Sequence, residues 1–380
     1  MSKLTVNKNV ASRFSEAEDL TCFWNVNKGE EFCLEGNLLP ILEWFVKPSD
    51  PGEVVKAEHH ETDKLQAYIQ LLVEEEILLP ANEEIEKANL WNPDTFFNLP
   101  LESIQGALNS PGSRKGIILG IPFDLNVTNL AGSKNAPNFL RMHSKANLPV
   151  TKTDEVRLFD SMSVYDCGNI SAVVPKQNGR EQLQLEFLIE KMIEFNCVPI
   201  CIGGDHSIVY SILRGMLKSK KINLIHLDAH YDYGNGYEIT FEQVHHGNFL
   251  DGILYNDNLL QVIQVGQRAR KDSRFIDHPK VRQLTVDEFC QETFNDGEYY
   301  ITFDVDVLDP SILSGTGTPL PFGLDLRDIQ KIMYKTRDIK IIGMDIVEFI
   351  PSAGKVEEAL LINEILYRWT EMISKGSTGE

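Results

Sequence analysis

The sequence predicts an α/β protein: a three-layer α/β/α domain on a mostly parallel sheet, with a smaller domain before it. Two observations support this. Continuous apolar runs alternate with helical stretches after residue 110, and Ser, Pro and Gly cluster at residues 110–116, where the chain changes character. Unbroken apolar runs are typical of strands covered on both faces, and strands alternating with helices form parallel sheets. We expect an N-terminal domain over residues 1–110 and the α/β domain over residues 111–380.

The larger domain has six apolar runs that predict strands, at residues 116–123, 198–204, 222–230, 259–266, 298–306 and 339–348. Helical periodicity marks residues 180–195 and 355–373. In sheets of this kind, ligands gather at the carboxyl ends of the strands. The acidic clusters of the sequence fall at these ends.

The first hundred residues have a different pattern. Residues 36–48 predict a helix ended by Pro48, and residues 49–57 predict a turn. Residues 62–77 predict a second helix with Thr62 as its N-cap, followed by a short strand at 77–80. Helix, turn, helix and strand are the parts of a winged-helix module. A helical cap packed on the α/β domain is the alternative.

Composition limits the class of protein. The 380 residues carry a formal charge of −20, which argues against a nucleic-acid partner. No apolar run is long enough for a membrane span and no secretory signal stands at the N-terminus, so we expect a cytoplasmic protein. The segment 1–110 holds 20 acidic and 8 basic residues, which favours a basic or apolar partner for it. Six cysteines without paired spacing predict reduced thiols.

Three strand ends carry acidic residues and histidines. The segment LDAHYD places Asp228, His230 and Asp232 at alternate positions, which project to one side of a strand. IGGDHS places His206 after two glycines that allow a tight turn. TFDVDVLDP places Asp304 and Asp306 at strand spacing. All of these side chains are expected at one edge of the sheet.

Carboxylates gathered so closely need cations, because like charges at short range would otherwise force several of them to protonate. Two divalent cations that share bridging carboxylates suit the count. Oxygen-rich ligation favours Mn²⁺ over structural zinc, with Ni²⁺ or another divalent metal as the alternative. The predicted metal ligands are His206, Asp228, His230, Asp232, Asp304 and Asp306.

In their order and separations, these three motifs closely resemble the metal-binding motifs of the arginase and agmatinase family of ureohydrolases. The segments 120–141, 315–324 and 343–352 extend the resemblance over roughly residues 116–370. The resemblance implies an arginase-like fold. It also implies a hydroxide held between two metal ions that attacks a guanidinium carbon, with release of urea and an amine.

The resemblance also implies the role of each residue. His206, Asp228, Asp232 and Asp304 would bind one metal, and His230, Asp228, Asp304 and Asp306 the other, with Asp228 and Asp304 as bridges. Asp232 would additionally carry a proton to the leaving nitrogen. Glu348 would pair with the substrate guanidinium. His246 would shuttle protons, with the adjacent His245 as the alternative.

Two departures from the family bear on the substrate. Gly234 stands where arginases that act on the free amino acid have Asn, so we take Tyr233 and Gly234 as substrate-binding positions. The aromatic residues Tyr231, Tyr233, Tyr237 and Phe241 either pack the loop or together line a wider mouth. The additional N-terminal domain resembles the architecture of peptide arginases of ribosomal-peptide pathways, in which the domain captures a leader sequence.

The predicted activity is therefore conversion of arginine residues in a precursor peptide to ornithine. The alternative is a hydrolase of a small guanidine: agmatine, guanidinobutyrate, guanidine or free arginine. A metal-bound but inactive binding protein is the third class. The family resemblance also implies a homo-oligomer.

Overall fold

The computed structural model of the chain describes residues 4–6, 10–15, 19–25, 30–43, 45, 49–57, 62–75, 77–80, 94–110, 112, 114–147, 159, 162–170, 180–352 and 354–375. The chain forms two compact units that divide between Pro93 and Asp94. Within the described residues, no helix has the length and apolar character that a membrane span requires.

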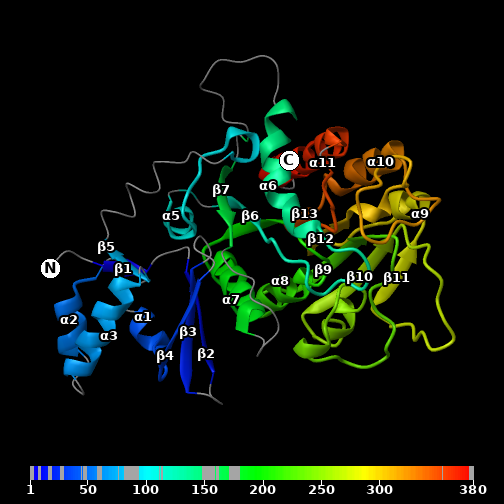
Figure 1. Cartoon of the computed structure of the whole chain (residues 1–380). Coiled ribbons are helices and arrows are strands. Elements are labelled where there is room, and N and C mark those ends of the chain that lie inside the picture. Colours follow the sequence, from blue (N-terminus) through cyan, green and yellow to red (C-terminus); the bar gives the residue numbers. More distant parts are fainter. Residues whose placement is uncertain are drawn as a thin grey trace. The chain divides into compact units, whose positions relative to one another are not determined.

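The larger unit is built on an eight-stranded sheet (Figure 1) in the order β11-β10-β9-β12-β13-β8-β6-β7. All of its strand pairs are parallel, which confirms the predicted fold class. The strands are β6 (Lys115–Gly120), β7 (Ser163–Asn169), β8 (Cys197–Ile202), β9 (Ile222–Leu227), β10 (Leu259–Val265), β11 (Val281–Leu284), β12 (Glu298–Asp304) and β13 (Lys340–Val347). The edge strands β7 and β11 carry polar positions and were not predicted.

Helices cover both faces of this sheet (Figure 1). Helices α7 (Arg180–Glu194) and α8 (Ile208–Leu217) lie on one face. Helices α6 (Ala136–Ser144), α9 (Val286–Gln291), α10 (Leu326–Thr336) and α11 (Val356–Lys375) lie on the other. The predicted helices at 180–195 and 355–373 correspond to α7 and α11.

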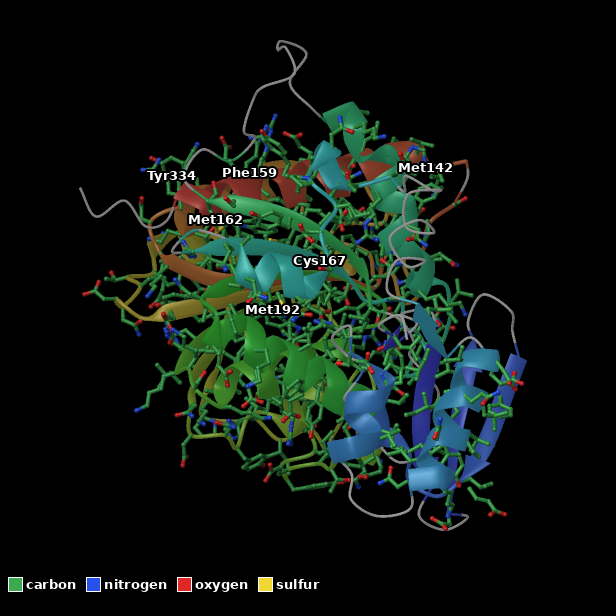
Figure 2. The ribbon with its side chains drawn as sticks, turned by 90° about the vertical axis from the view of Figure 1, so that its left-hand side faces the viewer. Met142, Phe159, Met162, Cys167, Met192 and Tyr334 are labelled. Atoms are coloured by element: carbon green, nitrogen blue, oxygen red, sulfur yellow. The ribbon has the colours of Figure 1, made fainter. Side chains whose placement is uncertain are left out.

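The covering helices are amphipathic, as their sequence period requires. Figure 2 shows Tyr334 on the exposed side of α10 and Met192 on the buried side of α7. On the inner side of α11, Trp369 is fully buried, and its ring lies 5.5 Å from that of Phe303 on β12. Strands β6, β8 and β9 are buried along their whole length.

The division between the units lies before the position expected at residue 110. Phe96 and Phe97, in the short 3₁₀ helix η1 (Phe96–Asn98), are fully buried in the core of the larger unit. The backbone N–H of Phe96 donates to Asp166 of β7 at 2.9 Å. Asp166 also forms a buried ion pair with Arg141 of α6, at 2.9 Å. Residues 94–110, including α5 (Ile104–Asn109), therefore belong with the sheet.

The smaller unit contains helices and antiparallel strands. Strand β1 (Leu4–Val6) pairs with β5 (Leu78–Pro80), and β2 (Val10–Ser15), β3 (Leu20–Asn25) and β4 (Glu30–Glu35) form a separate sheet. The helices are α1 (Leu39–Glu43), α2 (Pro51–Ala57) and α3 (Thr62–Glu74). Strands β2 to β4 were not predicted. The winged-helix assignment stays a prediction, and Pro48 lies outside the described residues.

Two expectations for this unit were wrong. The turn predicted at 49–57 is helix α2, because Pro51 is suited to the first turn of a helix and the Asp50 carboxylate accepts the N–H of Gly52 at 2.7 Å. Cys33, predicted to be reduced, is disulfide-bonded. It lies directly opposite Cys22 in the β3–β4 pairing, a proximity that linear spacing does not reveal.

Candidate metal centre and substrate pocket

The predicted site residues lie at the carboxyl ends of four neighbouring strands. In the sheet order β9-β12-β13-β8, these strands lead into the segments that contain Asp228, Asp304, Glu348 and His206. Strand β9 ends at Leu227, so Asp228, His230 and Asp232 lie in the following loop. The expected strand alternation is therefore not what brings them together. Asp232 has a positive φ of 54°, a backbone turn that the sequence pattern did not predict.

Two glycines let the segment after β8 approach its neighbours. A Cβ on Gly204 would lie 1.7 Å from the carbonyl oxygen of Phe123, so no side chain fits there. The N–H of Gly203 donates to Ile346 of β13 at 2.7 Å. These contacts place His206 at the centre of the strand ends.

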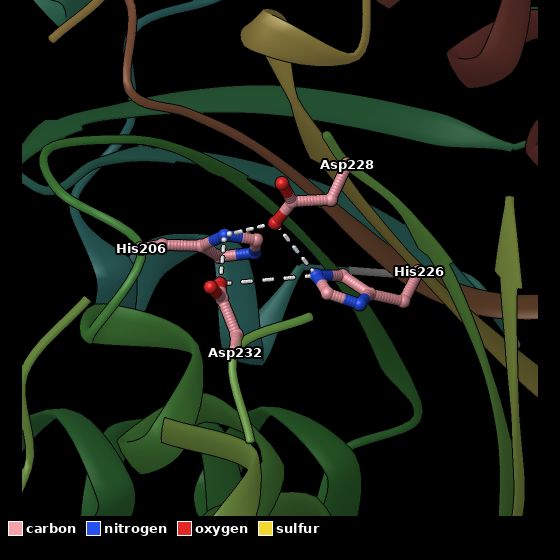
Figure 3. Close-up of side chains that lie close together, drawn as sticks. All are labelled: His206, His226, Asp228 and Asp232. Carbon is pink, nitrogen blue, oxygen red and sulfur yellow. Dashed lines mark hydrogen bonds and ion pairs between the residues drawn. The ribbon is translucent and has the colours of Figure 1, made fainter. Parts of the chain in front are cut away.

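One cluster forms around the Nδ1 atom of His206 (Figure 3). This atom lies 3.1 Å from Asp228 Oδ2 and 3.0 Å from Asp232 Oδ2, both drawn in Figure 3. It also lies 3.3 Å from Asp304 Oδ2. It is buried, yet it forms no hydrogen bond of acceptable geometry within the described part of the chain. An unsatisfied imidazole nitrogen that faces three carboxylate oxygens fits a cation as their common partner.

A second cluster forms around His230. Its Nδ1 atom lies 3.0 Å from Asp306 Oδ2 and 3.5 Å from Asp228 Oδ1. Asp228 thus presents one oxygen to each cluster, as a bridging carboxylate would. Asp304 differs, because its Oδ1 accepts the N–H of Asp306 at 2.8 Å and only Oδ2 faces His206.

The raised pKa values of the clustered carboxylates also indicate that cations bind here. Burial, and then the charges of Asp306 and Asp228, raise the pKa of Asp304 well above its usual value. Burial and Asp228 also raise the pKa of Asp232, to about 6. Carboxylates so close together are costly to ionise without compensating positive charge. The donor set of histidine nitrogens and carboxylate oxygens therefore fits two divalent cations.

The ring orientation of His206 is fixed by a buried chain of polar residues. The Thr302 hydroxyl donates to Asp345 Oδ1 at 2.7 Å, and its oxygen lies 2.8 Å from His206 Nε2. Since the only hydroxyl hydrogen is used on Asp345, Nε2–H of His206 donates to Thr302. His206 Nδ1 is then left with its lone pair toward the carboxylates.

A second buried chain reaches the bridging carboxylate. The side-chain amide of Gln264 donates from Nε2 to the carbonyl of Tyr231 and to Nδ1 of His226, both at 2.8 Å. His226 therefore carries its proton on Nε2 and donates it to Asp228 Oδ2 at 2.8 Å. We did not predict His226, although a histidine two residues before Asp228 in the sequence is a signal for it.

Glu348 and His246 contact each other at the rim of the centre. Glu348 is 2% exposed and has a φ of 64°. Its Oε1 accepts the N–H of His206 at 2.9 Å and lies 3.2 Å from His246 Nδ1. The N–H of Thr128 donates to His246 Nε2 at 3.0 Å, so the proton of a neutral His246 lies on Nδ1, facing Glu348. His246 therefore faces the site, while His245 Nδ1 accepts the N–H of Gly247.

A pocket of about 680 Å³ lies beside His206 and His230, the centres of the two clusters. Its lining includes His206, His230, Asp232, Asp304 and His246, together with Tyr231, Tyr233, Gly234, Tyr237, Arg270 and Phe275. Tyr237 and Arg270 are exposed and so lie at its mouth. The Tyr233 hydroxyl is directed to Asp277 and Gln283, at 3.3 and 3.2 Å, so only the ring of Tyr233 is available to a substrate. Phe241 is not part of the described lining and packs near Tyr210 instead.

Gly234 has no room for a side chain. Its φ is 146°, and a Cβ there would lie 2.7 Å from the ring of Phe275. The Asn that free-arginine hydrolases have at this place would require Phe275 and the backbone to move. The contacts that such an Asn could make are therefore absent from this pocket.

Comparison with known proteins agrees with this arrangement. A family model described as the arginase family matches residues 114–370. An agmatinase from Cronobacter sakazakii is 32% identical over 269 residues, covering 66% of this chain and 86% of the relative. An agmatinase from Neisseria gonorrhoeae is 31% identical over 249 residues, covering 62% and 79%.

A solved structure of proclavaminate amidino hydrolase from Streptomyces clavuligerus superimposes with a TM-score of 0.62 and 25% identity. It covers 75% of this chain and 98% of that one. The family match spans more than half of the chain and includes all of the predicted metal ligands. The chain belongs to the arginase family of ureohydrolases.

Proposed function

We propose that the protein hydrolyses the guanidino group of a small guanidine, with a centre of two divalent metal ions expected to be Mn²⁺. The observation that carries this is the pair of clusters around His206 and His230, joined by Asp228 and open to the pocket. The agmatinase relatives support a small guanidine over a peptide as the substrate. The chemistry that two cations supply when bound is a lowered pKa of water, which provides a nucleophile near neutral pH.

The side chains around the two clusters are suited to binding the guanidinium and to transferring a proton to the departing amine. Glu348 does not line the pocket itself but contacts His246, which does. Its buried carboxylate would pair with a guanidinium, a planar donor that carboxylates bind through two hydrogen bonds. Burial opposes protonation of His246, but the Glu348 carboxylate holds the pKa of His246 above its ordinary value. His246 can therefore hold a proton near neutral pH and deliver it to the departing amine nitrogen. Asp232, whose pKa is raised to about 6, is the second group suited to proton transfer.

The test is urea release by the Mn²⁺-loaded protein. Agmatine, 4-guanidinobutyrate, guanidine, free arginine and an arginine-containing peptide are assayed in parallel. We expect urea from at least one small guanidine and none from free arginine, because Gly234 cannot provide an asparagine contact to the α-carboxylate. Absence of urea from agmatine, 4-guanidinobutyrate and guanidine would contradict the proposal, whether or not the peptide reacts.

Peptide-arginine hydrolysis is the second candidate. It is favoured by the N-terminal unit, which has its own core of residues such as Phe23, Phe45 and Leu72 and precedes the segment matched by the family model. Within the described residues, β2 and β4 are the outer strands of the three-stranded antiparallel sheet, and an outer strand is suited to adding a peptide strand. In this case urea would come from the peptide alone, and peptides with a swapped or truncated leader would react more slowly. Equal rates with and without the leader would exclude this candidate.

A further inference from the structure

The charged residues at the mouth of the pocket differ in whether they already have partners. Asp251 is only 2% exposed, and its carboxylate accepts the backbone N–H groups of Gly234 and Asn235 at 3.2 Å. Asp272 forms an ion pair with Arg274 at 2.8 Å. These three charges are committed to the loop or to each other.

Arg270 is the exception. It lines the pocket and is exposed, and within the described part of the chain its guanidinium has no hydrogen bond or ion pair. An arginine at the mouth of a substrate pocket has five N–H donors and a permanent positive charge to offer.

The backbone beside Arg270 is anchored to the metal centre. The N–H groups of Arg268 and Ala269 both donate to the carbonyl of Ala229, at 2.9 and 3.1 Å. Ala229 stands between Asp228 and His230, one residue from a predicted ligand of each cluster. The Arg268 guanidinium holds the same segment further, through the carbonyls of Asp306 and Leu320 at 2.6 and 2.8 Å. Arg270 therefore has a fixed attachment point next to the metal clusters.

We propose that Arg270 binds the carboxylate at the far end of an ω-guanidino acid and disfavours guanidines with a cationic tail. The inference rests on the proposed function and specifies its substrate class. A guanidinium binds a carboxylate through paired, charge-assisted hydrogen bonds, and it repels an ammonium group. The other groups at the mouth do not compensate, because Gly234 has no side chain and the Tyr233 hydroxyl is directed to Asp277 and Gln283.

The test compares three guanidines of similar length that differ in the charge of the tail. They are 4-guanidinobutyrate with a carboxylate, butylguanidine with no charge, and agmatine with an ammonium. For the Mn²⁺-loaded full chain we expect kcat/KM to fall in that order. Arg270→Gln should reduce the ratio of guanidinobutyrate to agmatine about tenfold, the size expected for a partly exposed ion pair together with loss of the repulsion. Arg270→Glu should reverse the preference.

Arg274→Gln is the matched control. It removes an arginine of the same mouth whose charge is already paired with Asp272. We expect it to leave the ratio between the substrates within about twofold. An equal change of the substrate ratio in both variants would show that the net charge of the pocket mouth, and not Arg270 itself, determines the preference between the substrates. That result would refute the inference.

Binding of 4-guanidinobutyrate, measured by calorimetry, separates this inference from the proposed function. If urea is released but the substrate ratio is the same in the wild type and Arg270→Gln, only the inference fails. If no guanidine is hydrolysed, the proposed function fails, and tighter binding of 4-guanidinobutyrate to the wild type than to Arg270→Gln would still support the Arg270 contact. Equal binding to both proteins, or no binding, refutes it in every case.

Discussion

Thr302→Val tests whether the buried chain from Asp345 to His206 prepares the metal centre. Valine has nearly the shape of threonine, and Thr302 is fully buried, so the change removes a hydroxyl with little change in packing. It leaves Nε2–H of His206 and Oδ1 of Asp345 without the partners they have at 2.8 and 2.7 Å. The orientation of His206 toward the carboxylates is then no longer enforced.

The expected loss follows from these two contacts. A buried polar group left without a partner costs about 1–3 kcal/mol. Loss of an outer hydrogen bond to a metal-binding histidine weakens metal affinity about 10–100-fold. We therefore expect Thr302→Val to bind Mn²⁺ about 10–100-fold more weakly, measured by equilibrium dialysis, and to unfold at a lower temperature when metal-free.

Thr316→Val is the control for this experiment. Thr316 is 5% exposed, and its hydroxyl has no hydrogen-bond partner within the described residues. The same chemical change there should leave Mn²⁺ affinity unaltered and stability equal or slightly higher. If Thr302→Val bound Mn²⁺ as tightly as the wild type, or if Thr316→Val lost as much affinity, the reasoning would be refuted.

Three further perturbations test the site and the fold. Glu348→Gln keeps an acceptor for the His206 N–H but loses the charge that pairs with a guanidinium. We therefore expect kcat/KM for urea release to fall about 100-fold while Mn²⁺ binding stays unchanged. Weaker Mn²⁺ binding would instead show that Glu348 has a structural role. Removal of metal by a chelator should lower the unfolding temperature more at pH 8 than at pH 5. The folded pKa of Asp232, about 6, lies above its unfolded value, so the metal-free protein loses stability as pH rises through 6; an equal loss at both pH values would contradict this. Asp166→Asn leaves the buried Arg141 guanidinium without its ion pair. The free energy of unfolding, measured by thermal denaturation, should fall by about 3–5 kcal/mol. A fall of less than about 1 kcal/mol would show that water replaces the ion pair.

The amino-acid sequence was sufficient for the parts of this protein that depend on local pattern. Apolar runs predicted six of the eight strands in the sheet, because strands buried on both faces exclude polar residues. The residue types at three strand ends predicted which carboxylates and histidines gather. For the segment after β9 the predicted grouping rested on strand alternation, and that reason was wrong. A loop with a positive φ at Asp232 brings these side chains together instead.

Only the tertiary structure decided which side chains hydrogen-bond to the predicted metal ligands. Thr302, Asp345, Gln264 and His226 are polar residues in largely apolar strands. The sequence does not show what they contact, because most of their partners lie in other strands or loops. The same holds for Phe96, whose N–H reaches a residue 70 positions away, and for the pairing of strands that places Cys33 opposite Cys22. The sequence alone thus specified the chemical groups of the site, whereas strand order decided their partners, because hydrogen bonds across a parallel sheet join residues far apart in the chain.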